Sequence, residues 1–347
     1  MHPVPVFDGH NDVLLRLWLK TEGDPVADFL QGDGLGHLDM PRMKRGGFAG
    51  GFFAIFSPAD SEGLPDDDDV NPPLSGMLEQ SKALQKTLEM AALLFRIERE
   101  SQGKFKVCRT AGEIRDCLAK GITAAIFHIE GAEAIDDKFK TLDVLHESGL
   151  RSLGPVWSRS NIFGHGVPFR FPSTGDTGDG LTGAGKNLIR HCNELRLLID
   201  LSHLNEKGFW DAAKLSKAPL VATHSNAQAL SASSRNLSDD QLKAVRDSGG
   251  VVGLNFATGF LREDGRWRVD TPLEFMLRHL DHLIKVAGEN CVALGSDFDG
   301  ARIPAAIGDA TGLPNLVGAM REWEYGEKLI AKIAHENWLS VLERTWG

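Results

Sequence analysis

Eight short apolar segments recur along the chain, and most neighbouring pairs are separated by a stretch with helical periodicity. The pattern predicts strands over 4–10, 51–56, 123–130, 150–157, 197–203, 220–224, 251–256 and 292–297. It predicts helices over 74–100, 142–147, 187–195, 239–247 and 273–287, with further helices over 324–346. Strands that alternate with helices form parallel sheets, and apolar runs such as 124–127 are typical of strands covered on both faces. The chain is therefore predicted to be an α/β protein.

Polar residues at the strand ends favour a closed barrel over an open doubly wound sheet, which would show the same apolar runs. His10, Glu130, His203, His224 and Asp297 each stand at or just beyond the C-terminal end of a predicted strand. In (β/α)8 barrels this rim carries the active site. No internal repeat and no linker rich in Gly, Pro or Ser divides the sequence. We therefore predict a single (β/α)8 TIM barrel over residues 1–347.

Composition and charge exclude several classes of function. The formal net charge is −10, and no basic run is present, so nucleic acid is not an expected partner. No uncharged apolar stretch approaches the roughly 18–20 residues that span a bilayer, and the N-terminus lacks the regions of a signal peptide. We expect a cytoplasmic protein without membrane attachment. The four cysteines lack metal-site spacing and are expected to be buried thiols.

Two long insertions interrupt the alternating pattern. The segment 63–76 contains four consecutive aspartates, 66–69, which are expected to form a solvated loop because a calcium loop needs ordered ligand spacing. The segment 163–185 is rich in Gly and Thr and follows the fourth predicted strand. We predict that this second insertion folds over the rim as a lid.

Five residues at strand ends are candidate metal ligands. His10 and Asp12 are two positions apart, so on an extended chain both side chains leave the same face and reach one ion. His203 and His224 end consecutive strands, where a divalent metal would satisfy a buried imidazole. A satisfied core histidine is the competing interpretation for either one alone. Glu130 ends a strongly apolar strand, so it requires a metal or a salt bridge to an arginine, and a bidentate carboxylate can bridge two ions.

Other polar residues near these strand ends are candidates for catalysis and binding. Asp297 could take a proton from a metal-bound water and deliver it to a leaving amine. Asp299 points the same way, one step further out, and is expected to cap the following loop. Arg235 could hold a substrate carboxylate in a bidentate fork, although a surface arginine is the alternative. His128 shares a face with Glu130 but lies deeper, which predicts a hydrogen-bond donor rather than a ligand.

In their order along the chain, seven motifs resemble those of the membrane (renal) dipeptidase family, zinc peptidases of family M19 within the amidohydrolase-like superfamily. The resemblance covers nearly the whole chain and is closer to the bacterial branch. The motifs are Asp8-Gly9-His10-Asn11-Asp12, His37-Leu38-Asp39-Met40-Pro41-Arg42, Glu130-Gly131, Asp200-Leu201-Ser202-His203, Thr223-His224-Ser225, Ser234-Arg235-Asn236 and Gly295-Ser296-Asp297-Phe298-Asp299-Gly300.

The resemblance implies a metal-dependent hydrolase that cleaves dipeptides with two Zn²⁺ ions per chain. His10, Asp12 and Glu130 would hold one ion, and Glu130, His203 and His224 the other. A hydroxide between the metals would attack the peptide carbonyl, with Asp297 carrying the proton and Arg235 gripping the C-terminal carboxylate. A D-residue at the C-terminal position and a homodimer are further expectations from the family.

One motif departs from the family pattern. Animal members place a histidine near the end of the fourth strand, where it contacts the substrate carbonyl, whereas the matching position here is Trp157. His165 and Arg159, in the adjacent loop, are candidates for the missing donor, with structural roles as the alternative. We therefore group Trp157, His165 and Arg159 with Arg235 as candidate substrate-binding residues.

Two competing functions follow from the same residues. A lactonase or deaminase could use the same scaffold, because a metal-bound hydroxide attacks many electrophiles. The position of Arg235 favours a substrate with a carboxylate. A non-catalytic barrel protein is the other alternative, against which stands the presence of all the predicted ligands together with Asp297.

Overall fold

The computed structural model describes residues 3–59 and 66–347 and shows nine parallel strands. They are β1 (Val6–Asn11), β2 (Phe48–Phe56), β3 (Phe105–Val107), β4 (Thr123–Glu130), β5 (Leu150–Gly154), β6 (Leu198–Ile199), β7 (Val221–Ala222), β8 (Val251–Asn255) and β9 (Val292–Gly295). One sheet has the order β1-β2-β4-β5-β6, with β3 also paired to β4, and a second has the order β7-β8-β9. Parallel bridges Asp200–Val221 and Asn11–Phe298 join the two sheets. The strands thus close into the predicted (β/α)8 barrel.

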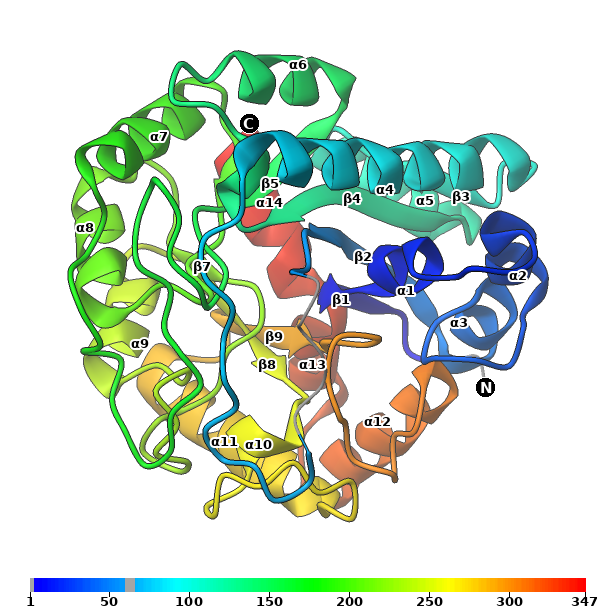
Figure 1. The fold of residues 1–347 in the computed structure, drawn as a ribbon. Coiled ribbons are helices and arrows are strands. Elements are labelled where there is room, and N and C mark those ends of the chain that lie inside the picture. Colours follow the sequence, from blue (N-terminus) through cyan, green and yellow to red (C-terminus); the bar gives the residue numbers. More distant parts are fainter. Residues whose placement is uncertain (1–2, 60–65) are drawn as a thin grey trace.

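The helices lie around the strands, most of them in an outer ring (Figure 1). They are α1 (Val13–Trp18), α2 (Pro25–Gln31), α3 (Met40–Gly46), α4 (Gln80–Glu100), α5 (Ala111–Lys120), α6 (Lys140–Ser148), α7 (Gly183–Glu194), α8 (Glu206–Leu215), α9 (Asp239–Asp247), α10 (Thr258–Leu261), α11 (Leu273–Ala287), α12 (Leu313–Glu322), α13 (Glu327–Ala331) and α14 (Asn337–Trp346). Short 3-10 turns lie at Ala132–Ala134 and Ala310–Gly312, and a π-helical turn spans Lys332–Glu336. Side-chain caps fix several helix starts, such as the capping box of Ser238 and Gln241 at α9.

The apolar core has two main layers. The larger one lies between the outer faces of the strands and the surrounding helices. The smaller one fills the barrel interior and includes Phe7, Phe52 and Val221, which pack with the C-terminal helix α14. The indole of Trp338 lies 5.2 Å from the ring of Phe52 and donates a hydrogen bond to the Leu294 carbonyl. Helix α14, behind the strands in Figure 1, therefore plugs the end of the barrel at which the strands begin.

All eight predicted strands are present, but their ends differ. The strand 123–130 is as predicted, whereas 150–157 ends at Gly154 and 197–203 is reduced to Leu198–Ile199. Beyond these points the chain leaves the sheet and turns over the rim, and His203 adopts a left-handed φ of 67°. The short strand β3 was not predicted. Helix α4 begins at Gln80 and not at residue 74, because Leu74 lies in the wall of the rim pocket instead.

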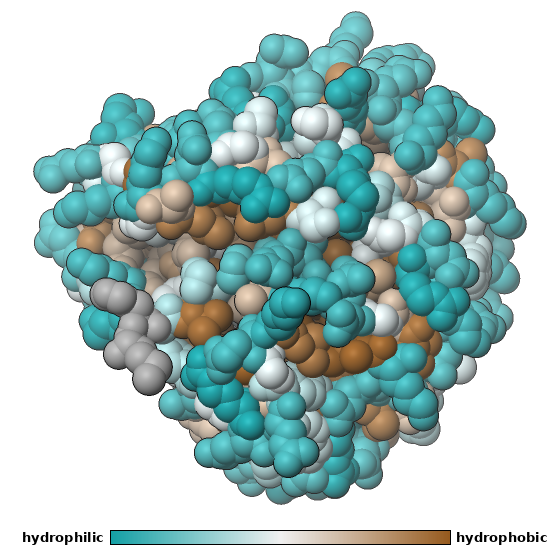
Figure 2. Space-filling model, turned by 180° about the vertical axis from the view of Figure 1, so that it is seen from behind, coloured by the Kyte–Doolittle hydropathy of each residue, from teal (hydrophilic) through white to brown (hydrophobic). Residues whose placement is uncertain are grey.

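The outer surface offers no membrane-spanning element: among the described residues, no helix is long and apolar enough to cross a bilayer. Figure 2 shows the face opposite to that in Figure 1. The face in Figure 2 is mainly hydrophilic, with hydrophobic residues gathered in narrow bands. All four cysteines are buried and unpaired by disulfides, as predicted. The Sγ atoms of Cys108 and Cys117 lie 3.8 Å apart beneath α5.

Candidate metal centre

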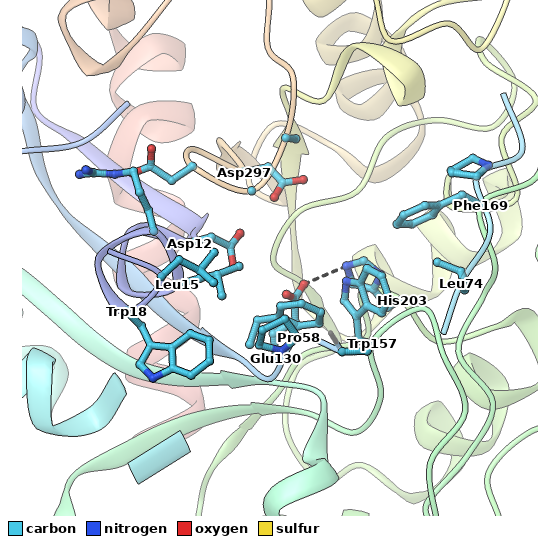
Figure 3. A pocket seen from close by; sticks show the side chains of 18 of the residues that line it. Asp12, Leu15, Trp18, Pro58, Leu74, Glu130, Trp157, Phe169, His203 and Asp297 are labelled. Atoms are coloured by element: carbon cyan, nitrogen blue, oxygen red, sulfur yellow. Dashed lines mark ion pairs between the residues drawn. The ribbon is translucent and has the colours of Figure 1, made fainter. Parts of the chain in front are cut away.

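The five candidate ligands converge at the C-terminal rim of the barrel. One carboxylate oxygen of Glu130, Oε1, lies 2.9 Å from Nε2 of His203, 3.3 Å from Nε2 of His224 and 3.5 Å from Nε2 of His10. Asp12 Oδ2 lies 3.3 Å from His10 Nε2. The residues form two groups, one with His10 and Asp12 and one with His203 and His224, and both groups share Glu130. Figure 3 shows Glu130 between Asp12 and His203.

Small residues allow the ligand-bearing strands to approach one another. A Cβ at Gly9 would lie 2.3 Å from the carbonyl oxygen of Thr223, so only glycine permits this separation of β1 and β7. The residue after Gly9 and the residue after Thr223 are both candidate ligands, and the rings of His10 and His224 lie with centroids 3.8 Å apart and planes tilted by 30°. The sequence Gly-His on β1 therefore brings two imidazoles to the same cavity.

Hydroxyl groups hold the rings of two histidines. Ser158 Oγ lies 2.7 Å from Nδ1 of His203, and Thr223 Oγ1 lies 2.8 Å from Nδ1 of His224. Thr223 Oγ1 also donates to Asp200 Oδ2 at 2.5 Å, which completes a carboxylate–hydroxyl–imidazole chain. With Nδ1 protonated and donating, Nε2 of each ring presents its lone pair towards Glu130.

His128 lies below the ligands, as its deeper position predicted. Its Nδ1 lies 2.9 Å from Ser152 Oγ, and its Nε2 lies 3.7 Å from Asp200 Oδ2. The ring meets that of His10 edge-on, with centroids 5.5 Å apart. Burial lowers the pKa of His128 to about 3, so this imidazole is neutral. His10, His128 and Asp200 are close enough to form another possible cation-binding group.

The charges of the centre fit a bound cation. Burial lowers the pKa of His203 and of His224 well below the ordinary value, so both rings are neutral and can act as ligands. Burial opposes a charge on His10, but the carboxylates of Glu130 and Asp12 outweigh it and raise its pKa to about 10. Among the described residues, neither ring nitrogen of His10 nor Asp12 Oδ1 has a hydrogen-bond partner. Divalent cations would satisfy these buried atoms, and imidazole and carboxylate are the ligands that zinc accepts.

Asp297 faces the same cavity from the end of β9. Asn255 Nδ2 donates to its Oδ2 at 2.8 Å, while burial raises the pKa of the Asp297 carboxyl. Its backbone is left-handed, with φ of 59°, a conformation that costs energy in a residue with a side chain. The hydrogen bond from its N–H to the His10 carbonyl, at 3.0 Å, supports this conformation. The carboxylate is thereby aimed at the candidate ligands.

The prediction for Asp299 was wrong. Instead of capping the following loop, its Oδ1 accepts a hydrogen bond from the backbone N–H of His37 at 2.6 Å, and its own N–H donates to His37 Nδ1 at 2.8 Å. Its other oxygen lies 3.3 Å from Nε of Arg16. The left-handed φ of 66° at Asp299 turns the carboxylate back towards the segment before α3. This residue joins the rim to the N-terminal part of the chain.

Arg235 is buried beside the candidate centre and is not among the described residues that line the pocket. Its Nη1 donates to Ser225 Oγ and its Nη2 to the His224 carbonyl, each at 2.8 Å. The guanidinium lies 5.8 Å from the centre of the Phe260 ring. Burial lowers its pKa to about 10, and Nε has no hydrogen-bond partner among the described residues. The arrangement places a positive charge beside the candidate centre, with three of the five guanidinium N–H groups not used by these two hydrogen bonds.

A cavity of about 560 Å³ opens above the candidate ligands, a size that suits small-molecule sites. Its polar lining includes Asp12, Glu130, His203 and Asp297. The apolar lining comes from several rim segments: Leu15, Trp18, Leu19, Phe56, Pro58, Pro72, Pro73, Leu74, Trp157, Phe169, Phe260 and Trp267. The cavity is thus a mainly apolar pocket with a polar base.

The three candidate binding residues from the loop after β5 have different environments. Trp157 lines the pocket, with its ring 5.8 Å from that of His203. The guanidinium of Arg159 lies 5.2 Å from the Trp157 ring and is buried in an ion pair with Glu133 at 3.0 Å. His165 Nδ1 lies 3.1 Å from Ser160 Oγ, and this ring is not part of the pocket lining. The geometry brings only Trp157 to the cavity.

Both insertions contribute to the rim. Phe169 of the segment 163–185 lies in the pocket wall, in agreement with the predicted position over the rim. In the first insertion, residues 63–65 lie outside the described residues. Asp67 pairs with Arg302, and Asp68 lies 3.1 Å from Arg268. These aspartates are exposed, as expected of a solvated loop, and the candidate metal-binding groups among the described residues do not include them.

Several residues of the site were missed by the sequence analysis. Ser158, Thr223 and Asn255 hold functional side chains but have no distinctive spacing of their own. Asp200 and Thr223 belong to the motifs that contain His203 and His224, and this closeness in sequence could have identified them as partners of these histidines. The pocket residues of α1 could have been found from their helical spacing after Asp12.

The chain is similar to known peptidases over its full length. A family model described as membrane dipeptidase, peptidase family M19, matches residues 1–346. A solved metallopeptidase from Rhodobacter sphaeroides, liganded with a phosphinate mimic of the dipeptide L-Ala-D-Ala, has 56% sequence identity and a TM-score of 0.97, with 99% of this chain and 100% of that chain covered.

Two further relatives agree with this match. The solved structure of the dipeptidase AC, a metallopeptidase of family M19, has 56% identity and a TM-score of 0.94, with 99% of each chain covered. An uncharacterized protein from the pqqA 5′ region of Klebsiella pneumoniae is 47% identical over 258 residues, which are 74% of this chain and 95% of that protein. The family match includes every residue of the candidate centre.

Proposed function

Because the chain belongs to the membrane dipeptidase family of metallopeptidases, family M19, we propose that it hydrolyses dipeptides at a centre of two zinc ions. His10, Asp12 and Glu130 would hold one ion, and Glu130, His203 and His224 the other. The observation that carries the proposal is the position of Glu130 Oε1, within 3.5 Å of three buried imidazole nitrogens, one from β1 and the others from the segments that follow β6 and β7. A carboxylate in that position is suited to bridge two cations.

The side chains around the ions would prepare the peptide for hydrolysis. Zinc bound at this centre would supply a nucleophilic hydroxide and polarise the scissile carbonyl. Asp297, held by Asn255, would accept the proton of the nucleophile and transfer it to the nitrogen of the leaving residue. The buried charge of Arg235 would bind the C-terminal carboxylate of the substrate. Trp157 would form the side of the pocket next to His203.

We also propose that the C-terminal residue of the substrate can be a D-residue. The support is the similar metallopeptidase liganded with a phosphinate mimic of L-Ala-D-Ala, whose chain is 56% identical to this one. We propose further that residues 1–347 form a single domain and that two chains associate as a homodimer, as in the family. Light scattering coupled to size-exclusion chromatography tests the homodimer.

A dipeptide panel with metal analysis tests the proposed reaction. The protein, purified without chelator and supplied with zinc, should bind two ions per chain and hydrolyse both L-Xaa-L-Xaa and L-Xaa-D-Xaa dipeptides. Glu130→Gln should bind less zinc than the wild type, and its kcat/KM should be at least about 100-fold lower. Glu194→Gln, at an exposed position on α7, is the matched control and should retain both. Hydrolysis of lactones or aminopurines without hydrolysis of dipeptides would overturn the proposal.

A further inference from the structure

An apolar surface on one side of the candidate centre is not needed to bind metal or to carry out hydrolysis. It consists of Leu15, Trp18 and Leu19, and we call it the α1 shelf. All three residues line the pocket, and Leu19 is 58% exposed. An apolar side chain this exposed at the mouth of a cavity gains free energy when a ligand covers it.

The position of the α1 shelf follows from the local sequence. Helix α1 begins directly after Asp12, and residues three or four apart share one face of a helix. Asp12, Leu15 and Leu19 follow that spacing, and Trp18 is three positions after Leu15. The face of α1 that presents the candidate ligand Asp12 therefore also presents the shelf to the same pocket.

The indole of Trp18 is held in place on two sides. Its Nε1 donates to Glu89 Oε2 at 2.7 Å. The ammonium of Lys86 lies 5.7 Å from the centre of the ring and donates to the Pro58 carbonyl at 2.7 Å. A fixed aromatic surface loses little conformational entropy when a ligand packs on it. The shelf is thus a preformed binding surface.

The orientation of the dipeptide in the pocket determines which of its two residues contacts the α1 shelf. Arg235, proposed to bind the C-terminal carboxylate, lies next to Phe260, which packs against Phe169 at 5.4 Å. Figure 3 shows Phe169 on the His203 side of Glu130, with Leu15 and Trp18 on the other side, near Asp12. A dipeptide with its carboxylate at Arg235 and its carbonyl above Glu130 extends its N-terminal residue towards α1.

We propose that the α1 shelf is the subsite for the N-terminal residue and selects dipeptides in which this residue has a large apolar side chain. This inference rests on the proposed dipeptidase function. Leu, Met or Phe would pack against Leu15, Leu19 and the indole of Trp18. The cationic side chains of Arg16 and Lys86 also line the pocket, and the carboxylate of Asp299 is already paired with Arg16 at 3.3 Å, so a Lys or Arg side chain gains no ion pair with it at the shelf. Asp or Gly would leave the shelf uncovered.

The first test is the rate of hydrolysis of a dipeptide series with a constant C-terminal alanine. For the zinc-loaded protein, kcat/KM should be roughly tenfold or more higher for Leu-Ala and Phe-Ala than for Ala-Ala. Lys-Ala and Asp-Ala should fall below Ala-Ala. Equal kcat/KM values across the series would overturn the assignment of the subsite.

The second test changes the shelf itself. In Trp18→Ala the ratio of kcat/KM for Phe-Ala to that for Ala-Ala should fall to about threefold or less, whereas Trp18→Phe should restore most of it. Trp323→Ala is the matched control, because this exposed indole also donates to a carboxylate, Asp281, but lies outside the pocket. Leu15→Ala, a smaller change, should lower the ratio even if Trp18→Ala folds poorly. A ratio unchanged in Trp18→Ala and Leu15→Ala would refute the role of the shelf.

The series separates this inference from the proposed function. If no dipeptide is hydrolysed in the presence of zinc, the dipeptidase function itself fails. If dipeptides are hydrolysed with no preference at the N-terminal residue, the function stands and the α1 shelf is not its specificity subsite. A preference that responds to the C-terminal residue alone would likewise refute the shelf.

Discussion

Replacing Ser158 by alanine removes the hydroxyl that orients the ring of His203. Ser158 Oγ and His203 Nδ1 are 2.7 Å apart, and both residues are buried. When Nε2 binds a metal, Nδ1 carries the proton and donates it to Ser158. In Ser158→Ala this buried N–H has no acceptor, which costs about 1–3 kcal/mol. The ring can recover part of that cost only by rotating, which moves Nε2 away from Glu130.

Zinc affinity measures the effect directly. A penalty of about 1–3 kcal/mol corresponds to roughly 5- to 150-fold weaker binding of the ion that His203 is proposed to hold. Competition with a chromophoric chelator at fixed pH gives the dissociation constant of each zinc ion proposed to bind here. In Ser158→Ala we expect the dissociation constant of the ion proposed to bind His203 to rise by this factor. We also expect kcat to fall less at saturating zinc than at limiting zinc.

The matched control is another serine–histidine pair in the same loop. Ser160 Oγ lies 3.1 Å from Nδ1 of His165, whose ring is outside the pocket lining. Ser160→Ala should leave zinc affinity within about twofold of the wild type. The explanation fails if Ser158→Ala binds zinc as tightly as the wild type, or if Ser160→Ala weakens zinc binding equally.

Three further predictions concern substrate binding and stability. Arg235→Lys should reduce kcat/KM for dipeptides by roughly 100-fold and leave the slow hydrolysis of dipeptide amides unchanged, and equal losses for both would contradict carboxylate binding. Trp338→Ala should lower the free energy of unfolding by about 3–5 kcal/mol in urea titrations, with Trp323→Ala near the wild type. Burial lowers the pKa of His279 to about 4, so its contribution to stability is complete above the unfolded pKa near 6.5 and is lost as the pH falls towards 4. Between pH 7 and pH 5 the free energy of unfolding of His279→Gln should therefore fall by roughly 1–2 kcal/mol less than that of the wild type. An equal fall in both proteins would refute this.

The strands could be predicted because they are buried on both faces. A segment such as 123–130 is continuously apolar up to the carboxylate of Glu130, so its start, its end and its functional residue are visible together. The ends of β6 and β7 were less visible, since both are short and the chain then turns into the site. There the backbone is set by the contacts of His203 and His224 and not by periodicity.

Hydrogen-bond partners could be predicted only where they are near in sequence. Thr223 is adjacent to His224, but Ser158 is 45 residues from His203. Asp299 and His37 are 262 residues apart, and the spacing within either motif carries no information about the other. Local reasoning therefore placed Asp299 in its own loop and was wrong. Positions that closure of the barrel brings together require the fold itself.

The glycines of the barrel interior explain how a plugged barrel can still hold a polar centre. A Cβ at Gly253 or Gly295 would lie 2.0 Å from the carbonyl oxygen of Thr223, so both strands approach β7 closely at this level. Side chains two positions apart on a strand share a face. Asn255 follows Gly253 on the inward face of β8, and Asp297 lies two positions after Gly295, just beyond the end of β9.

The plug and the centre thus occupy successive layers of one interior. A Cβ at Gly9 would lie 2.5 Å from the indole of Trp338, so the ring fills the space that the glycines leave. Barrel interiors are normally filled by branched side chains in layers. Here one tryptophan from α14 packs in the layer below, and the glycine layer above it lets His10, Asn255 and Asp297 meet at the candidate metal centre. The tight packing at the base therefore sets the distances between the residues at the rim.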